Sequence, residues 1–315
     1  MSEAAPTAAV LAPTPHLTVT VEGRSGHDDI HLHAGGQAVW VARMLVELGV
    51  RSQLCGPVGG ETGRVLRTLV GEDGLEWRAV ASEGRNAAYL HDRRSGERRI
   101  LAEMPADGLD RHVFDDVYGT FLSAALGADV AVLVGAEGAT AEAVFPAESH
   151  ERLARDLAEV ECRTVADLSG AALLAAAAGG VEIVKVSAED LQRDGMVEGV
   201  EVGTVVAAAR RLQEMGAGPV VVSRGQDPAV VATPDGVLEL RVPTMTTVDH
   251  RGAGDSMTAG IAAAIAYGLP MLVALQWGAA AGALNVTRHG LGTGSREAIR
   301  RLVEHVEIVP LEVSA

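Results

Sequence analysis

Short apolar runs of strand length alternate with longer helical patterns along most of this 315-residue chain. The strand-like runs are 17–21, 52–58, 130–134, 164–166, 183–186 and 220–223, and the helical patterns are 37–48, 63–69, 148–160 and 204–215. This alternation is typical of a mainly parallel sheet, because parallel strands need a crossover that is usually a helix. We therefore expect an α/β fold with helices on both faces, whose ligand site lies beyond the carboxyl ends of the strands.

Composition and charge exclude several classes of protein. The formal net charge of −16 is opposite to the basic surface of nucleic-acid-binding proteins, so we expect no nucleic-acid partner. Residues 256–286 carry no charged side chain, but Gly268-Leu269-Pro270 divides them into two segments of helix length, which predicts buried helices and no membrane span. Residues 1–15 have no signal-peptide pattern, and we interpret them as a disordered tail before a single cytoplasmic domain at 16–315.

Two segments interrupt the alternation with short strands of period two. These are residues 29–33 and the pair 87–91 and 98–102, which a turn at 94–97 joins. His31 and His33 alternate along the first of them and His27 lies just before it, which leaves zinc binding as an alternative. A structural zinc site usually has four ligands, and no second cluster is evident, so contact with a substrate or a second subunit is the favoured interpretation.

The segment 250–260 combines small residues with a carboxylate where a helix is expected to begin. Gly252 and Gly254 leave room for a phosphate to approach the backbone, and the apolar run after Asp255 predicts a helix whose free N–H groups point at this loop. The partial positive charge of a helix start suits a phosphoryl group in transfer, and Asp255 could accept the proton of an attacking hydroxyl. A glycine loop capped by an aspartate explains the same residues, so the remaining motifs must decide.

Those motifs indicate a family. Gly-Ala-Gly-Asp at 252–255 resembles the C-terminal signature of the ribokinase-like (pfkB) carbohydrate kinases, in which it forms the anion hole and supplies the catalytic base. Further segments resemble that family in order and spacing: 34–43, 59–63, 167–170, 183–190 and 221–225. The segments at 167–170 and 183–190 look like the 1-phosphofructokinase and tagatose-6-phosphate kinase branch. The resemblance implies a ribokinase-like fold, a small β-sheet lid near 23–34 and 85–103, and ATP and Mg²⁺ as cofactors.

The resemblance also implies roles for individual residues. It makes Asp255 the base and gives the anion hole to the N–H groups of Gly252, Ala253 and Gly254. Nucleotide or phosphate binding is expected at Lys185, Ser187, Ser223, Gly225, Gly278 and Ala281. Acceptor binding is expected at Gly35, Gly36, Gln37, Trp40 and Arg85. Asp190 would hold Mg²⁺, mostly through water.

The acceptor positions depart from the family pattern. Gln37 and Trp40 stand where the family has a lysine and an asparagine that face the sugar. The tryptophan could stack on a sugar or a base, or belong to the core. The family's early substrate-binding aspartate, expected shortly after the first strand, has no clear counterpart, and Glu22, Asp28 and Asp29 are the candidates.

The phosphate positions are closer to the pattern. Lys185 is the only lysine in the chain, and its place at a strand end indicates contact with a phosphate, a lone surface lysine being the alternative. Ser187 and Asp190 replace the asparagine and glutamate of the family's Asn-x-x-Glu motif. Arg85 stands where this branch binds the acceptor's own phosphate, a task suited to a guanidinium. The alternative for Arg85 is a solvated hairpin.

These observations predict an ATP-dependent kinase for a sugar, in the first place a phosphorylated sugar. One alternative is a kinase of a nucleoside or another small alcohol that stacks on Trp40. A second alternative is a binding or regulatory homologue with weakened catalysis. The lid could also form the interface of a homodimer.

Overall fold

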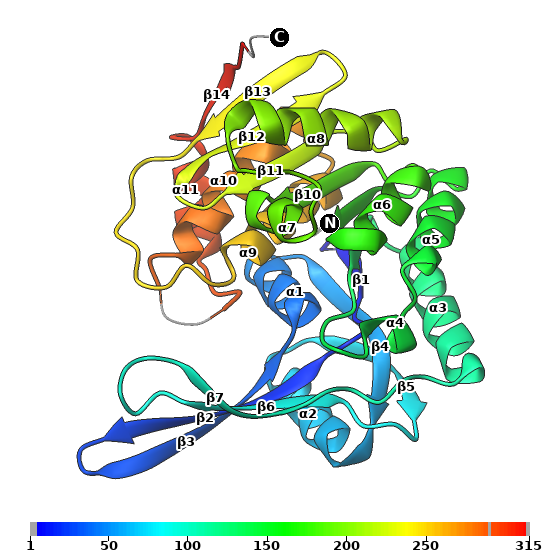
Figure 1. Cartoon of the computed structure of the whole chain (residues 1–315), viewed down its shortest axis with the longest axis vertical. Helices are drawn as coiled ribbons and strands as arrows, with labels where there is room; N and C mark the ends of the chain where they lie inside the picture. Colours follow the sequence, from blue (N-terminus) through cyan, green and yellow to red (C-terminus); the bar gives the residue numbers. More distant parts are fainter. Residues whose placement is uncertain (1–4, 289–290, 313–315) are drawn as a thin grey trace.

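The computed structural model describes residues 5–288 and 291–312, which form two β-sheets and their covering helices (Figure 1). The strands are β1 (Thr7–Leu11), β2 (His16–Arg24), β3 (His27–Gly35), β4 (Arg51–Gly59), β5 (Glu76–Ser82), β6 (Ala87–Asp92), β7 (Arg99–Met104), β8 (Val130–Val134), β9 (Thr164–Asp167), β10 (Ile183–Ser187), β11 (Val220–Arg224), β12 (Asp227–Thr233), β13 (Gly236–Arg241) and β14 (Glu307–Pro310). The helices are α1 (Gln37–Glu47), α2 (Gly60–Glu72), α3 (Arg111–Leu126), α4 (Ala141–Val144), α5 (Glu148–Glu159), α6 (Gly170–Ala178), α7 (Ala188–Arg193), α8 (Val202–Glu214), α9 (Ala253–Ala266), α10 (Met271–Asn285) and α11 (Arg296–Val303).

The larger sheet has ten strands in the order β14-β13-β12-β11-β10-β9-β8-β1-β4-β5. The strands from β11 to β5 pair in parallel, and β12, β13 and β14 extend the sheet with antiparallel pairs. This is the predicted α/β architecture. The carboxyl ends of β1, β8, β9, β10 and β11 therefore lie along one edge of the sheet, where the predicted site residues follow them.

Helices cover both faces of this sheet, and each face has its own apolar core. Successive side chains of a strand point to opposite faces, and Ala8 and Val10 of β1 pack in one core while Ala9 and Leu11 pack in the other. The first core contains residues of α1, α2, α9 and α10, and the second contains residues of α3, α5, α6 and α8. The strands read as unbroken apolar runs because both of their faces are buried.

The predicted disordered tail is wrong for residues 7–11. They form β1, which lies between β4 and β8 with every residue buried. Small side chains suffice there because helices cover the sheet on both sides, so the alanine-rich composition that suggested disorder is compatible with a central strand. The predicted first strand of the main sheet, 17–21, belongs instead to β2 of the smaller sheet.

The smaller sheet has four strands in the order β3-β2-β6-β7 and projects from the body of the molecule (Figure 1). It contains both segments that were expected to form a lid, with β3 joined to β2 and β7 joined to β6 by antiparallel pairing. At the other side of the molecule, residues 256–286 form the two expected helices, α9 and α10. Among the described residues, no helix is long and apolar enough to cross a membrane.

Candidate active site

The loop before α9 has the geometry that its glycines predicted. Gly252 caps the helix with a φ of 73°, in the left-handed region that favours glycine. A Cβ at this position would lie 3.2 Å from a side-chain carbon of Leu291. The buried Asn285, at the end of α10, donates a hydrogen bond of 2.7 Å from its amide to the Arg251 carbonyl and so fixes the loop. Sequence reasoning did not single out Asn285.

Asp255 lies in the first turn of α9, next to the free N–H groups of the helix start. Loss of hydration and the negative charge of Asp167 raise the pKa of Asp255 above the usual carboxyl range, against the opposing effect of Lys185. A general base is most effective when its pKa is near the working pH, so the shift suits the predicted role.

Lys185 lies on β10, and its ammonium packs against Gly254 at the start of α9. Its ammonium lies 3.2 Å from both carboxylate oxygens of Asp167, at the end of β9, and its side chain is 6% exposed. A Cβ on Gly254 would lie 2.5 Å from the Lys185 nitrogen. Burial disfavours the charged form, but Asp167 and Asp255 raise the pKa of Lys185, so the ammonium stays charged. The structure thus brings the only lysine to the predicted anion hole.

Asp167 is the centre of a buried polar network. The sequence did not single it out as a site residue. Besides the Lys185 ammonium, it accepts a hydrogen bond of 2.6 Å from the Thr258 hydroxyl, one turn after Asp255. The signal was present, because β9 and β10 were both predicted as parallel strands with a charged residue near the end. The register pairs Lys185 directly with Asp167.

Ser187 and Asp190 form a closed pair at the end of β10. The Ser187 hydroxyl donates to Asp190 Oδ2 at 2.6 Å and accepts from the Asp190 N–H at 3.0 Å, while Arg193 binds the other oxygen. Ser223 lies on β11 directly opposite Ser187, and Gly225 follows in a turn with a φ of 61°. These four nucleotide-side residues therefore cluster at one edge of the sheet.

The two helical residues predicted to line the nucleotide pocket, Gly278 and Ala281, lie where α10 packs against α9. Ala281 is fully buried in the core, and a Cβ on Gly278 would lie 2.6 Å from the Ile261 side chain. Gly260 of α9 is equally close to the backbone of Trp277. The small residues allow the close crossing of α9 and α10, and this packing explains them without a nucleotide.

At the residues predicted to bind the acceptor, the end of β3 turns sharply into α1. Gly36 caps α1 with a φ of 107°, and a Cβ there would lie 3.2 Å from the Thr14 carbonyl oxygen. A Cβ on Gly35 would lie 2.6 Å from the His16 ring. Gln37 is the first residue of α1. The two glycines therefore allow the turn to pack against residues 12–16, the loop that follows β1.

Trp40 lies on α1 at the edge of a cluster of rings. It is half-buried, and the His16 ring packs against it edge-on with centroids 6.1 Å apart. The other neighbour of His16 is Tyr89 of β6, at 4.7 Å. The Trp40 side chain is thus neither fully in the core nor freely exposed.

The candidates for an early aspartate are wrong, because the first strand is β1 and not 17–21. Glu22, Asp28 and Asp29 all lie on the strands of the small sheet, well beyond the turn after β1. The residue that occupies the beginning of β2 after that turn is His16. Burial, together with the neighbouring His91 and Arg98, lowers the pKa of His16 to about 4, so its ring is neutral at pH 7.

The Arg85 side chain is hydrogen-bonded to the carboxylate of Asp107. Its guanidinium donates to both oxygens of Asp107, at 3.0 and 3.1 Å, and its side chain is 54% exposed. The basic groups nearer the acceptor residues are Arg98 of the lid and Arg251 of the loop before α9. Each is close enough to His91 to lower its pKa, and Arg98 donates to the His91 ring at 2.7 Å.

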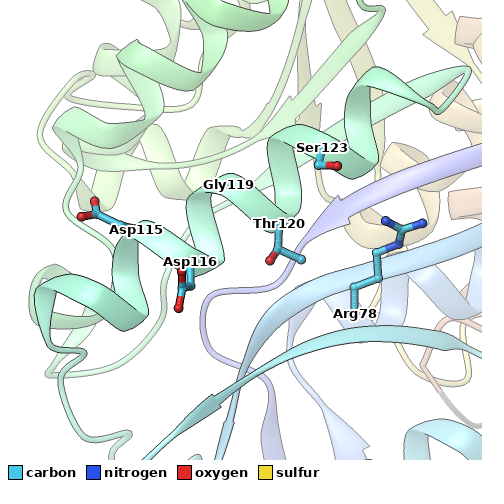
Figure 2. A pocket seen from close by; sticks show the side chains of 6 residues that line it. All are labelled: Arg78, Asp115, Asp116, Gly119, Thr120 and Ser123. Carbon is cyan, nitrogen blue, oxygen red and sulfur yellow. The ribbon is translucent and has the colours of Figure 1, made fainter.

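Among the described residues, no three side chains of His, Cys, Asp or Glu gather to hold a metal ion, which applies also to the histidines of β3. Asp190 stays the predicted Mg²⁺ ligand. Its two oxygens already accept from Ser187 and Arg193, but each can still accept from a water of this ion, which keeps several waters and takes its other ligands from phosphates. Figure 2 shows a hollow between β5 and α3 that contains none of the predicted site residues; it is lined by Arg78, Asp115, Asp116, Gly119, Thr120 and Ser123.

Comparison with known proteins supplies the family. The family model described as "pfkB family carbohydrate kinase" matches residues 16–298. The chain belongs to the pfkB family of carbohydrate kinases. As a member, it is a phosphotransferase that acts on a sugar hydroxyl.

Among its relatives, 1-phosphofructokinase of Bacillus subtilis is 29% identical over 94% of either chain. An ATP-dependent 6-phosphofructokinase isozyme 2 of Mycobacterium tuberculosis is 28% identical over 86% of this chain and 79% of that protein. The crystal structure of phosphofructokinase-2 from Escherichia coli has the same fold, with a TM-score of 0.82 at 24% identity over 95% of this chain and 98% of that one. The predicted ribokinase-like fold of the pfkB kinases is confirmed.

Proposed function

We propose that this chain transfers the γ-phosphate of ATP to a hydroxyl group of a phosphorylated sugar, with Asp255 as the general base. The observation that carries the proposal is the meeting of three groups at the start of α9. Asp255 lies in the first turn, the N–H groups of Gly252, Ala253 and Gly254 precede it, and the Lys185 ammonium packs against Gly254. Free N–H groups and a positive charge thus adjoin the proposed base.

In this mechanism, the acceptor hydroxyl gives its proton to the Asp255 carboxylate while its oxygen attacks the γ-phosphorus. The bond from that phosphorus to the bridging oxygen breaks, and ADP leaves. The N–H groups of 252–254 donate to the oxygens of the transferred group, whose charge they stabilise. Lys185, held by Asp167, adds a fixed positive charge. Mg²⁺ bound to ATP would neutralise part of the phosphate charge, with Asp190 and Ser187 holding it through water.

Two observations favour a phosphorylated acceptor. The relatives named above are phosphofructokinases, and the acceptor side carries the arginines Arg98 and Arg251 close to His91. A guanidinium binds a phosphate through charge-assisted, often bidentate hydrogen bonds. We assign the acceptor's phosphate to Arg98 in preference to Arg85 and Arg251, because Asp107 accepts from the Arg85 guanidinium and Asp249 accepts from that of Arg251.

A nucleoside is the second candidate acceptor, and the half-buried Trp40 favours it. Its ring lies beside His16 and could stack on a base. A phosphosugar requires Arg98, whereas a nucleoside requires Trp40. Alanine variants of these two residues therefore distinguish the two acceptors.

We also propose that the smaller sheet pairs two copies of the chain. Ile30 and Leu32 point to one face of β3 and are 59% and 45% exposed, and Ile100 and Leu101 of β7 are 55% and 43% exposed. Exposed apolar side chains grouped on one small sheet are typical of protein–protein interfaces. The E. coli phosphofructokinase-2 is described as tetrameric in its inhibited form. Light scattering of wild type and Ile30→Asp/Leu32→Asp should give a dimer and a monomer; a wild-type monomer contradicts the proposal.

Turnover of ATP with a panel of acceptors tests the function. The panel contains fructose 1-phosphate, fructose 6-phosphate, tagatose 6-phosphate, fructose and adenosine. Asp255→Asn should lose roughly a hundredfold or more of the turnover, because the amide cannot accept a proton. Asp235→Asn, the same change in the exposed turn between β12 and β13, is the matched control. Near-normal turnover by Asp255→Asn contradicts the assignment of the base.

A further inference from the structure

His91 of β6 lies among three guanidinium groups, and the mechanism above does not use it. The residue is 2% exposed. Arg93 and Arg98 belong to the lid, and Arg251 belongs to the loop before α9. Burial and the charges of these three arginines lower the pKa of His91 to about 4. The imidazole is therefore neutral at pH 7, so it adds no further positive charge to the group.

Two of the three arginines are paired with carboxylates, and the third is not. Arg251 forms an ion pair with Asp249, and Arg93 lies 3.6 Å from Glu22. Within the part of the chain that the structure describes, no carboxylate lies within ion-pair distance of Arg98. Its guanidinium instead donates to Nε2 of the imidazole at 2.7 Å. Burial and the charges of Arg251 and Arg93 lower the pKa of Arg98, so its surroundings repel the cation that the imidazole holds.

A neutral imidazole holds a guanidinium differently from a carboxylate. An arginine side chain has only donors, so Nε2 of His91 must be the unprotonated nitrogen that accepts, and Nδ1 carries the proton. This bond fixes the direction of the Arg98 head group, leaves its other N–H groups free and leaves its charge uncompensated. The contrast within this chain is Arg85, whose charge is paired with that of Asp107. Arg98 is thus both ordered and available to an anion.

The His91 ring is itself held in place by other rings. Tyr89, two residues earlier on β6, stacks on it with ring centroids 6.1 Å apart and planes at 16°. Tyr89 packs in turn against His16, which meets Trp40 edge-on, one of the residues predicted to bind the acceptor. Arg98 is close enough to His16 and Tyr89 for its charge to act on their pKa values. The bond from Arg98 to the imidazole therefore lies beside the predicted acceptor residues.

We propose that His91 is a positioning residue that orders the Arg98 guanidinium for the acceptor's phosphate without neutralising it. Without this bond, repulsion by Arg93 and Arg251 turns Arg98 toward solvent, and the acceptor must order a long side chain when it binds. Ordering such a side chain costs free energy that is subtracted from binding. The proposal rests on the proposed function and adds how its phosphate-binding residue is held.

Steady-state kinetics of His91→Phe tests this role, because phenylalanine keeps the stacked ring and removes the accepting nitrogen. With the phosphosugar of highest turnover, we expect the acceptor KM to rise about threefold to tenfold, the cost of ordering one long side chain, while kcat and the KM for ATP stay within about twofold. His91→Gln restores an acceptor atom and should recover part of the affinity. The matched control is His112→Phe, at an exposed position of α3. Melting temperatures check the fold, and His91→Leu is the second variant if His91→Phe does not fold.

A double-mutant cycle with Arg98 separates positioning from a general effect on the lid. Because His91 acts through Arg98, His91→Phe/Arg98→Ala should have the acceptor KM of Arg98→Ala alone. With fructose, which has no phosphate, His91→Phe should match the wild type. If the two effects multiply, or if His91→Phe keeps a normal KM for the phosphosugar, this inference is overturned while the kinase function stands. A wild-type chain that phosphorylates no phosphosugar of the panel overturns the proposed function itself, and this inference with it.

Discussion

The Lys185 ammonium packs so closely against Gly254 that only a glycine fits at position 254: a Cβ there would lie 2.5 Å from the ammonium nitrogen. Gly254 is thus needed for this contact as well as for the approach of a phosphate to the backbone. It admits the one buried cation of the proposed anion hole.

Gly254→Ala should therefore lower turnover much more than stability. The added methyl group displaces the Lys185 ammonium, and a shift of about 1 Å in a catalytic group costs roughly a hundredfold in rate. Alanine also favours the helix by about 1 kcal/mol, which offsets part of the strain. Kinetics and thermal melts of Gly254→Ala separate the two effects. A variant with normal kinetics would show that the contact has no role.

Lys185→Met should lower both stability and turnover. It leaves the buried Asp167 carboxylate without its ion-pair partner, and breaking a buried pair in this way typically costs about 3–5 kcal/mol. Asp167→Asn/Lys185→Met removes both charges and should recover part of the stability but none of the activity. Chemical denaturation and turnover measure the two properties. Equal stability of the single and double variants would refute the ion-pair explanation.

Arg98→Ala should weaken a phosphosugar acceptor about tenfold to a hundredfold, since a charge-assisted contact to its phosphate is lost. Arg85→Ala is the matched control, because Asp107 binds that guanidinium. With the dephosphorylated sugar, Arg98→Ala should match the wild type. Acceptor KM values decide the question, and a large effect of Arg85→Ala alone would restore the assignment made from the sequence.

Activity and stability should change in opposite directions with pH. Loss of hydration and the charge of Asp167 raise the pKa of Glu137 to about 7, and the pKa of Asp255 is also raised. Because Asp255 acts as a base only when ionised and its pKa is raised to about 8, kcat/KM for the acceptor should fall as the pH falls through about 8. The native state binds these protons more tightly than the unfolded state does, so acidification from pH 8 to 6 should raise the free energy of unfolding.

A pH–rate profile and denaturation at several pH values check both trends. Glu137→Gln should move the acid limb of kcat to lower pH, because a negative neighbour of Asp255 is removed. An acid limb at the same pH in both proteins would show that the two carboxyl groups do not interact.

Local signals in the sequence predicted the part of the site that is built from one continuous segment. The glycines before Asp255 predicted a loop with an unusual backbone conformation, and the apolar run after them predicted a buried helix. Lys185 could be placed at the end of a parallel strand because the alternation of strands and helices was clear. The same reasoning brought Ser187 and Ser223 to neighbouring strand ends, which the register of β10 and β11 bears out.

The sequence was least informative about residues whose role depends on how the elements pack together. Gly278 and Ala281 are small because two helices cross closely, which a sequence cannot tell from a pocket lining. Glu137 stands in a loop with no motif of its own, and only the fold brings it near Asp255. Phosphate binding by Arg85 stays a prediction, and the sequence alone could not show that Asp107, 22 residues later, accepts hydrogen bonds from its guanidinium.

The position of β1 bears on how the N-terminus can be altered. Residues 7–11 lie between β4 and β8, so they join the strands β4 and β5 with the seven strands that include β10 and β11, which carry Lys185 and Ser223. Trimming the chain at residue 15, as its composition invites, would remove an interior strand and open a gap between β4 and β8. Tags and fusions at this end therefore need a spacer that leaves these five residues free to insert.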